Sequence, residues 1–334
     1  MLLPTSDLKI SVVICAYTEE RWEELLAAVV SVQEQKRPPD EIVVVIDHNS
    51  SLYGRACQAL KNVIVIENHE VRGLSGARNS ALTLVKGDVI AFMDEDATAS
   101  SDWLEILTLH YQDEAVLGVG GQIKPDWQFK KPDWFPEEFY WVVGCTYRGL
   151  PEQAAPVRNL IGCNMSFRRE VFNTVKAFRN GIGRVGTLPV GCEETELCIR
   201  ARQFWPDRNF IYDPQAIVLH HVPSKRSTFS YFFSRCYSEG ISKALVTRYT
   251  GARSGLNSEW KHTLKVLPFG ILSGFQDAIF RGDVYGLARA SAIITGLFFT
   301  TYGFLIGLMK EHWKPDNQSE SEETVIPDSL VINQ

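Results

Sequence analysis

Short apolar runs alternate with amphipathic stretches through the first third of the chain. The apolar runs are typical of buried strands, and in the stretches between them apolar residues recur every three or four positions, as on one face of a helix. The predicted strands cover residues 10–15, 42–46, 63–66 and 89–93, and the predicted helices cover residues 20–35, 53–60 and 74–85. This order predicts an α/β fold with a doubly wound, mostly parallel sheet that binds ligands beyond the carboxyl ends of its strands.

The strand at 89–93 ends in an acidic triplet, Asp94, Glu95 and Asp96. In extended chain Asp94 and Asp96 point the same way and Glu95 points elsewhere. Two converging carboxylates suit Mg2+ or Mn2+, because hard cations prefer oxygen ligands. An acidic, solvated turn before the next helix explains the triplet equally well when the triplet is taken alone.

The middle of the chain continues the α/β pattern. Strands are predicted at 116–123, within 158–170 and at 216–222, and a helix follows residue 191 with Glu193, Glu194 and Glu196 in its first turn. Acidic side chains stabilise the amino-terminal end of a helix, where the helix dipole is positive. When the stretch is taken alone, this effect is enough to explain the three glutamates. The aromatic residues of 132–141 suit either sugar stacking or core packing.

The last third is more apolar. Residues 229–249 mix aromatic and basic side chains, as in an amphipathic helix near an anionic surface or an ordinary packed helix. Residues 266–280 are apolar but short and contain Asp277, which favours an interfacial or re-entrant helix. Residues 290–309 contain no charged residue and match the roughly 20 residues that cross a bilayer, although a buried helix pair is the alternative.

These segments predict a division of the chain into four parts. The catalytic domain covers 8–228, with a donor half at 8–123 and an acceptor half at 124–228. An amphipathic helical linker at 229–262, hydrophobic membrane-associated helices at 263–314 and a disordered acidic tail at 315–334 follow.

Composition and charge exclude several classes of protein. The formal net charge of -6 argues against a nucleic-acid partner, which needs a basic surface. Seven cysteines without a Cys-x-x-Cys pair indicate neither a zinc ribbon nor a disulfide framework. Residues 1–9 do not form a signal peptide, so the catalytic domain is expected in the cytosol. The first strand lacks the Gly-x-Gly-x-x-Gly that a nicotinamide enzyme would carry after it.

Four motifs, taken in order and spacing, resemble the family 2 glycosyltransferases with a GT-A fold. They are Ser11-Val-Val-Ile-Cys-Ala-Tyr, Ile42-Val-Val-Val-Ile-Asp-His-Asn-Ser, Gly73-Leu-Ser-Gly-Ala-Arg-Asn and Phe92-Met-Asp-Glu-Asp. The resemblance implies that the first two loops hold the uracil and ribose of a UDP-sugar. It places Arg78 near the diphosphate and a divalent metal, Mn2+ or Mg2+, on the Asp-x-Asp pair. The glycines and helix start of 72–79 would bring Arg72 near phosphates as well, although a turn and a solvated helix face explain that stretch when it is taken alone. The donor-binding residues so implied are Ala16, Tyr17, Glu19, Asp47, Arg72, Arg78 and Asp94, and the metal ligands are Asp94 and Asp96.

The resemblance extends to the acceptor half. Gly191-Cys-Glu-Glu-Thr-Glu-Leu matches the family's Glu-Asp-x-Glu-Leu pattern, with Glu194 where relatives place the catalytic aspartate. Glu194 is therefore the predicted general base, with Glu193 as its alternative. A histidine binds the metal in some GT-A enzymes, which points to His220 or His221. The predicted acceptor residues are Trp134, Tyr140, Trp141, Asn164 and Glu196.

Over residues 10–310, and especially in Trp134-Phe-Pro-Glu-Glu-Phe-Tyr-Trp and Gly191-Cys-Glu-Glu-Thr-Glu-Leu, the chain resembles the glucuronosyltransferase-like members that act on glucosyl dolichyl phosphate. The resemblance implies an inverting, metal-dependent transfer from a nucleotide-sugar, such as UDP-glucuronate, to a lipid-linked or glycan acceptor. The expected location is the cell membrane, with the catalytic domain on the cytoplasmic face. A nucleotidyltransferase acting on a sugar phosphate and a non-catalytic nucleotide-sugar-binding protein are the alternatives.

Overall fold

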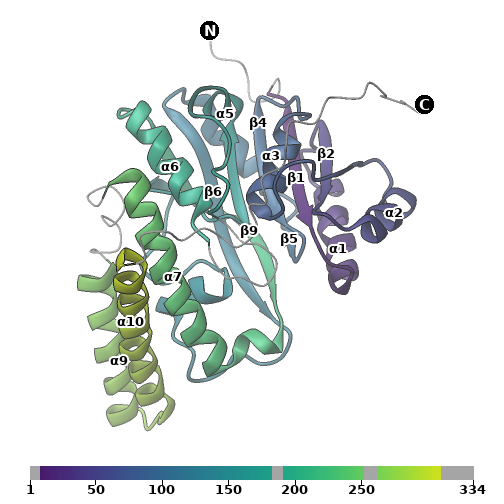
Figure 1. The fold of residues 1–334 in the computed structure, drawn as a ribbon. Coiled ribbons are helices and arrows are strands. Elements are labelled where there is room, and N and C mark those ends of the chain that lie inside the picture. Colours follow the sequence, from purple (N-terminus) through teal and green to yellow (C-terminus); the bar gives the residue numbers. More distant parts are fainter. Residues whose placement is uncertain (1–7, 183–190, 252–261, 310–334) are drawn as a thin grey trace.

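Four parallel strands form the first part of the sheet (Figure 1). Their order is β3-β2-β1-β4, and α1, α2 and α3 connect them. This computed structural model describes residues 8–182, 191–251 and 262–309. The elements of this part are β1 (Ile10–Ala16), η2 (Glu19–Arg21), α1 (Trp22–Gln33), β2 (Glu41–Ile46), α2 (Ser50–Ala59), β3 (Ile64–Glu67), α3 (Leu74–Leu82) and β4 (Val89–Asp94). The strands and helices predicted for this part are confirmed.

The strands are apolar on both sides because helices cover both faces of the sheet. Every residue of β1 is buried. Val12 and Ile14 belong to one core with residues of α1 and α2, whereas Val13 and Cys15 belong to a second core with residues of α3. Successive side chains of a strand point to opposite faces, so a continuous apolar run is what a sheet covered on both faces requires.

The second part of the sheet is mixed. It continues in the order β4-β8-β6-β9-β5, with β7 paired to β9. β8 is antiparallel to β4 and β6, whereas β6 and β9 are parallel. The doubly wound α/β class is confirmed, with the antiparallel strands confined to this part. Its elements are β5 (Ala97–Ala99), α4 (Trp103–Leu109), η3 (His110–Gln112), β6 (Val116–Trp127), η4 (Glu137–Val143), β7 (Ala155–Val157), β8 (Asn164–Arg168), α5 (Arg169–Val175), α6 (Glu193–Phe204), β9 (Asn209–Val222) and η5 (Ser224–Ser227).

Strand register brings the end of β4 beside two later strands. Met93 lies opposite Asn164 at the start of β8. Ala97 of β5, just past the acidic triplet, lies opposite His220 of β9. Residues far apart in the chain therefore meet around Asp94.

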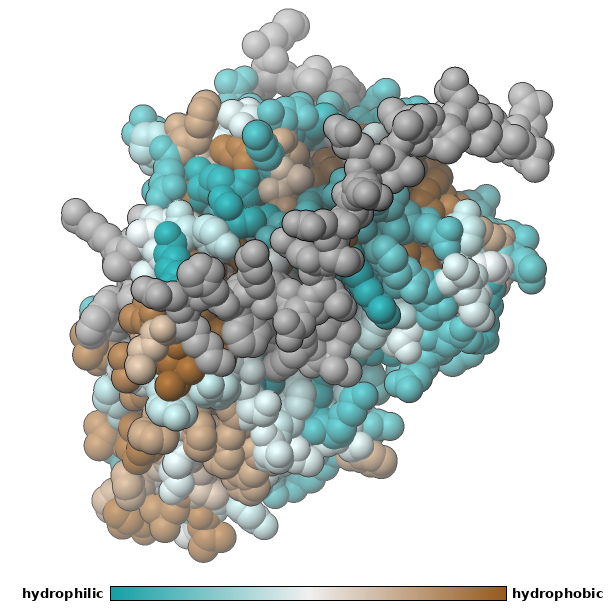
Figure 2. All heavy atoms as spheres, in the orientation of Figure 1, coloured by the Kyte–Doolittle hydropathy of each residue, from teal (hydrophilic) through white to brown (hydrophobic). Residues whose placement is uncertain are grey.

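Three long helices complete the described chain. They are α7 (Phe229–Thr250), α9 (Leu267–Phe280), which follows the π-helical turn η6 (His262–Val266), and α10 (Tyr285–Met309). α9 and α10 lie side by side as a hairpin, and α10 also packs along α7 (Figure 1). Apolar residues gather over α9 and α10, at the lower left of Figure 2. By length and composition α10 is able to cross a membrane. The predicted tail at 315–334 lies outside the described residues.

Glycines let α7 and α10 approach closely. A Cβ atom on Gly240 would lie 2.1 Å from the carbonyl oxygen of Thr300, and one on Gly303 would lie 2.0 Å from that of Tyr237. Both distances are far shorter than a carbon and an oxygen tolerate. α7 is therefore a packed helix along this side, which favours the second of the two sequence-based interpretations of residues 229–249.

We expect Gly303→Ala to lower the free energy of unfolding by about 1–3 kcal/mol, because the added methyl group forces α7 and α10 apart. The measurement is urea unfolding in a mild detergent. Gly54→Ala is the matched control, since Gly54 lies in α2 and a Cβ atom there would have no atom within 4 Å. In this control the free energy of unfolding should be unchanged or slightly higher. Equal stability of the two variants would contradict the close packing.

Candidate active site

The acidic triplet after β4 divides into two parts. Asp94 is partly exposed, whereas Glu95 and Asp96 form a buried turn before β5. Arg21 pairs with both buried acids, at 2.7 Å from Glu95 Oε1 and 3.0 Å from Asp96 Oδ2. The prediction that Asp94 and Asp96 point the same way assumed extended chain, and the turn removes that condition. Glu95, expected to point elsewhere, shares a partner with Asp96.

Asp96 is surrounded by cationic and imidazole groups. His220 Nε2 lies 3.3 Å from its Oδ1, and Arg226 lies 3.6 Å from its Oδ2. Burial opposes ionisation, but His220, Arg21 and Arg226 together hold the pKa of the Asp96 carboxyl well below its ordinary value. Burial raises the pKa of Glu95 to about 7. Asp96 therefore stays ionised and orients the ring of His220.

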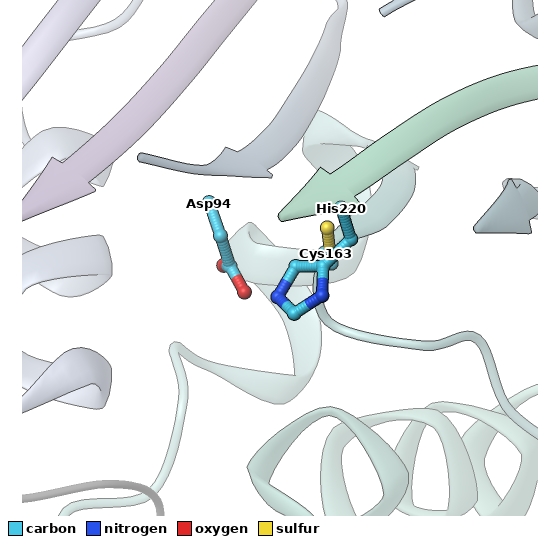
Figure 3. Close-up of side chains that lie close together, drawn as sticks. All are labelled: Asp94, Cys163 and His220. Atoms are coloured by element: carbon cyan, nitrogen blue, oxygen red, sulfur yellow. The ribbon is translucent and has the colours of Figure 1, made fainter. Parts of the chain in front are cut away.

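Asp94, Cys163 and His220 form a group of three potential metal ligands. One ligand atom from each lies within 4.8 Å of the others. In Figure 3 the three side chains point toward one another, from the end of β4, from the loop before β8 and from β9. The strand register explains the meeting, because Cys163 and Asp94 are the next residues beyond the pair Met93 and Asn164.

The chemistry of this group fits a divalent ion. A carboxylate and an imidazole suit Mn2+, while the thiol of Cys163 adds a softer donor. His220 Nδ1 lies 3.8 Å from Cys145 Sγ, so a second thiol flanks the ring. His221 points to the other side of β9, where its Nδ1 lies 4.0 Å from Asp126. Of the two histidines, the structure therefore brings His220 to this group, and it does not bring His221.

Arg78 joins the donor and acceptor halves. Its side chain is 2% exposed, and its guanidinium donates to Glu193 Oε1 at 2.7 Å and to the Gly162 carbonyl at 3.1 Å. Asp94 Oδ1 lies 3.5 Å away. Glu193 is thus a buried acid neutralised by an arginine from the opposite half.

Glu194, the next residue, is in a different situation. It is partly buried and lines the main cavity. No ion pair joins it to a cation within the described ranges. Burial first, and then the neighbouring charge of Glu193, raise the pKa of Glu194 to about 8. A carboxylate that holds its proton more strongly than usual is a stronger base once ionised.

A cavity of about 650 Å³ connects these groups to the carboxyl-terminal helices. Asp94, His220 and Cys163 line it together with Glu193 and Glu194. Trp141 of η4 and residues between 144 and 162 also line it, and α7, η6, α9 and α10 contribute further wall. One space therefore runs from the potential metal ligands, past two acids, to apolar helices.

The other predicted acceptor residues lie away from this cavity. Trp134 stacks on Phe229 with 3.8 Å between ring centroids, and Tyr140 lies under Lys131. Asn164 is fully buried, donating to the carbonyls of Gln122 and Ala216 and accepting from Trp103. Glu196 pairs with Arg200 at 2.7 Å and Arg179 at 3.3 Å. All four hold the fold together, and Trp141 is the predicted acceptor residue that the structure brings to the cavity.

The predicted donor loops lie at the carboxyl ends of β1 and β2. Ala16 ends β1 and is buried, and Asp47 accepts hydrogen bonds from the Gly73 amide at 3.0 Å and from Asn68 at 2.6 Å. Asp47 thus holds the loop before α3 in place. Three further predicted donor residues are exposed, namely Tyr17, Glu19 and Arg72.

Sequence reasoning missed Cys163 and the place of the polar face of α7 in the cavity wall. Cys163 falls within 158–170, a segment predicted to contain a strand, but only the pairing of β4 with β8 places it beside Asp94. Arg235, Glu239 and Lys243 of α7 line the cavity. Their spacing of four residues was a visible sign of a shared helix face.

Comparisons with known proteins place the chain in a family. Residues 11–176 match the model of glycosyl transferase family 2. The chain is 35% identical to glucosyl-dolichyl phosphate glucuronosyltransferase of Haloferax volcanii, over 90% of this chain and 97% of the relative. It is 23% identical to succinoglycan biosynthesis protein ExoM of Rhizobium meliloti, over 76% of this chain and 81% of that relative.

Solved structures share the fold. A mannosyltransferase from Pyrobaculum calidifontis, in complex with GDP-Man and Mn2+, aligns with a TM-score of 0.56 at 17% identity, over 90% of each chain. GalNAc-T7 with UDP, GalNAc and Mn2+ aligns with a TM-score of 0.50 at 18% identity, over 76% of this chain and 53% of the other. The sequence match and the GT-A fold agree, and the chain belongs to glycosyltransferase family 2.

Proposed function

We propose that this glycosyltransferase transfers a sugar, with inversion, from a nucleotide-sugar bound at Asp94 to a lipid-linked acceptor. The cavity carries the proposal, because it joins the Asp94 group, Glu194 and the apolar helices in one space. The names of the relatives support the two substrates: the Haloferax relative is named for a dolichyl phosphate, and the Pyrobaculum structure holds GDP-Man and Mn2+. UDP-glucuronate and glucosyl dolichyl phosphate are therefore the first pair to test.

Glu194 is the proposed general base. In an inverting transfer the acceptor hydroxyl attacks the anomeric carbon on the face opposite the departing diphosphate, and a carboxylate accepts the hydroxyl proton. Glu193 is engaged by Arg78, so its charge already has a buried partner. Glu194 faces the cavity and has the higher affinity for a proton.

Asp94 and His220 are the proposed metal ligands, with Cys163 beside them. A divalent ion there supplies electrostatic stabilisation of the leaving diphosphate. Asp96 keeps His220 in position rather than binding the ion, because Arg21 and Arg226 already surround its carboxylate. The exposed residues Tyr17 and Arg72 lie at the strand ends where the nucleotide is proposed to bind.

The exposed face of the hairpin is proposed to lie in the membrane surface. Large apolar side chains on α9 and α10 are exposed, among them Phe269 at 68% and Phe298 at 63%. α10 packs along α7, and Arg289 near its start donates to the Asp133 carbonyl at 3.2 Å. A helix fixed to the catalytic part along its length fits an in-plane arrangement better than a perpendicular crossing. A lipid-linked acceptor then reaches the cavity from the bilayer.

We expect Glu194→Gln to lower kcat by about 10²–10⁴-fold while nucleotide-sugar binding, measured by thermal shift with Mn2+, is retained. In the parent, log(kcat/KM) should rise with pH and level off above about 8, where Glu194 is ionised. The control is Glu193→Gln, which leaves the guanidinium of Arg78 without its carboxylate and should cost about 3–5 kcal/mol of stability. Full activity of Glu194→Gln would exclude Glu194 as the base.

Glu194→Gln should also stabilise the fold at high pH. The folded chain holds the Glu194 proton more tightly than the unfolded chain, whose pKa is near 4.5, so this group lowers stability as the pH rises from 4.5 through about 8. The Tm of the variant should therefore exceed that of the parent above pH 8, and the difference should vanish near pH 4.5. A constant Tm difference across this range would contradict the raised pKa.

We expect Cys163→Ser to weaken Cd2+ binding by about tenfold or more and to spare Mn2+ binding, because a thiolate favours the softer ion. Ultraviolet absorption of the Cd2+–thiolate complex measures the first effect, and manganese electron paramagnetic resonance measures the second. Cys57→Ser is the control, since Cys57 is exposed and lies in α2. Equal Cd2+ affinity in the two variants would show that Cys163 does not contact the ion.

We expect the double variant Phe269→Glu and Phe298→Glu to bind lipid vesicles about tenfold or more weakly, because each change replaces an apolar ring by a charge. Vesicle flotation measures the effect. Phe204→Glu is the matched control, since Phe204 is 60% exposed but lies on α6. Equal flotation of the double variant and the parent would place the membrane surface elsewhere.

A further inference from the structure

One face of α7 places two basic side chains and an acid in the wall of the cavity. Arg235, Glu239 and Lys243 follow one another at intervals of four residues, so they share a face of the helix. All three line the cavity. Arg235 lies 3.6 Å from Glu239, and Lys243 lies 3.3 Å from the same carboxylate. Arg235 is 7% exposed, so its charge sits deep in the protein.

This face lies directly beside the proposed catalytic acids. Cys192 Sγ donates to Glu239 Oε1 at 3.4 Å, and the Gly191 amide donates to Ser242 Oγ at 3.1 Å. These two contacts attach the start of α6 to α7. Because Glu193 and Glu194 come next in the chain, this face of α7 begins beside the proposed base.

On its other side α7 packs against α10, whose residues continue the cavity wall. Leu297 and Phe304 of α10 line the cavity, and so do Val266 and Leu267 at the start of α9. Figure 1 shows α7 between α6 and the hairpin. The cavity thus passes from a carboxylate to basic groups and then to an apolar wall.

A sugar linked to a prenyl chain through phosphate has the same sequence of chemical groups. Its hydroxyls are at one end, its anionic phosphate follows after one sugar ring, and its apolar chain comes last. Arginine and lysine are the side chains that bind phosphate oxygens, arginine through two parallel hydrogen bonds. Glu239 is close enough to both cations to hold them in position, and Lys243 and Arg235 lower the pKa of Glu239 against the effect of its burial.

We propose that Arg235 and Lys243 bind the phosphate of a prenyl-phosphate-linked acceptor. The proposal rests on the proposed function, since it places the acceptor sugar at Glu194. It assigns the acceptor phosphate to α7, whereas the donor diphosphate is assigned to the group around Asp94. The phosphate thereby fixes how far the acceptor enters and which part of its sugar reaches the base.

The test is the binding of farnesyl phosphate in detergent micelles, measured by tryptophan fluorescence in the Glu194→Gln background, so that transfer is not needed. Arg235→Gln and Lys243→Gln should each raise the Kd by about tenfold or more, because each removes a charge-assisted contact. The Kd of Arg235→Lys for farnesyl phosphate should lie between that of Arg235→Gln and that of the parent. Arg248→Gln is the matched control, since Arg248 is on α7 but does not line the cavity.

Farnesol and inorganic phosphate show whether binding depends on the prenyl chain, on the phosphate or on both. Farnesol should bind all variants alike, since it lacks the phosphate, and inorganic phosphate should compete only weakly. Unchanged farnesyl phosphate binding in folded Arg235→Gln and Lys243→Gln overturns the proposal. Inorganic phosphate that binds as tightly as farnesyl phosphate also overturns it, because the site would then serve a free anion.

Transfer assays distinguish this proposal from the proposed function. If farnesyl phosphate binding depends on Arg235 and Lys243 but no lipid-linked acceptor is glycosylated, the phosphate site stands and the proposed function fails. If transfer occurs and the KM for the lipid-linked acceptor is the same in Arg235→Gln as in the parent, the proposed function stands and the phosphate site fails.

Discussion

The buried ion pair between Arg78 and Glu193 is the constraint on which the site depends. Arg78 comes from a helix of the parallel part of the sheet, and Glu193 begins a helix of the mixed part. Both side chains are almost fully buried, so separating them would leave an uncompensated charge at a cost of about 3–5 kcal/mol. The pair therefore fixes the distance between Asp94 and Glu194. Of the two neighbouring glutamates that line the cavity, it also leaves Glu194 as the one that Arg78 does not engage.

The same cavity explains why the carboxyl-terminal helices are integral to the catalytic part. α7 contacts the start of α6 through Glu239 and Ser242, and α10 packs on α7 through glycines. Without α10 the cavity would lose Leu297 and Phe304 from its apolar wall, and without α7 it would lose the basic groups of that helix. The apolar hairpin is thus part of the proposed acceptor site as well as a surface for lipid.

The sequence was sufficient for the strand and helix order, because buried parallel strands leave unbroken apolar runs and amphipathic helices keep their period. It was insufficient where contacts depend on tertiary structure. A turn at Glu95 and Asp96 cannot be read from a run of acids, and it places Asp96 in a pair with Arg21. Asparagine and tryptophan are residue types that often bind sugars, yet Asn164 is held by buried hydrogen bonds and Trp134 stacks on Phe229. The position of Cys163 beside Asp94 depends on the pairing of β4 with β8, which no local sequence pattern predicts.

Asp94, Cys163 and His220 come from three segments that are distant in the chain and adjacent in the sheet. A ligand held by all three would act as a reversible cross-link, joining the end of β4 to β8 and β9. Such a cross-link stabilises the folded chain by preferential binding, because the three ligand atoms come together only in the folded sheet. Binding of the ion and its donor would then raise the stability of the packing between the two halves of the sheet, and stable packing would in turn favour binding.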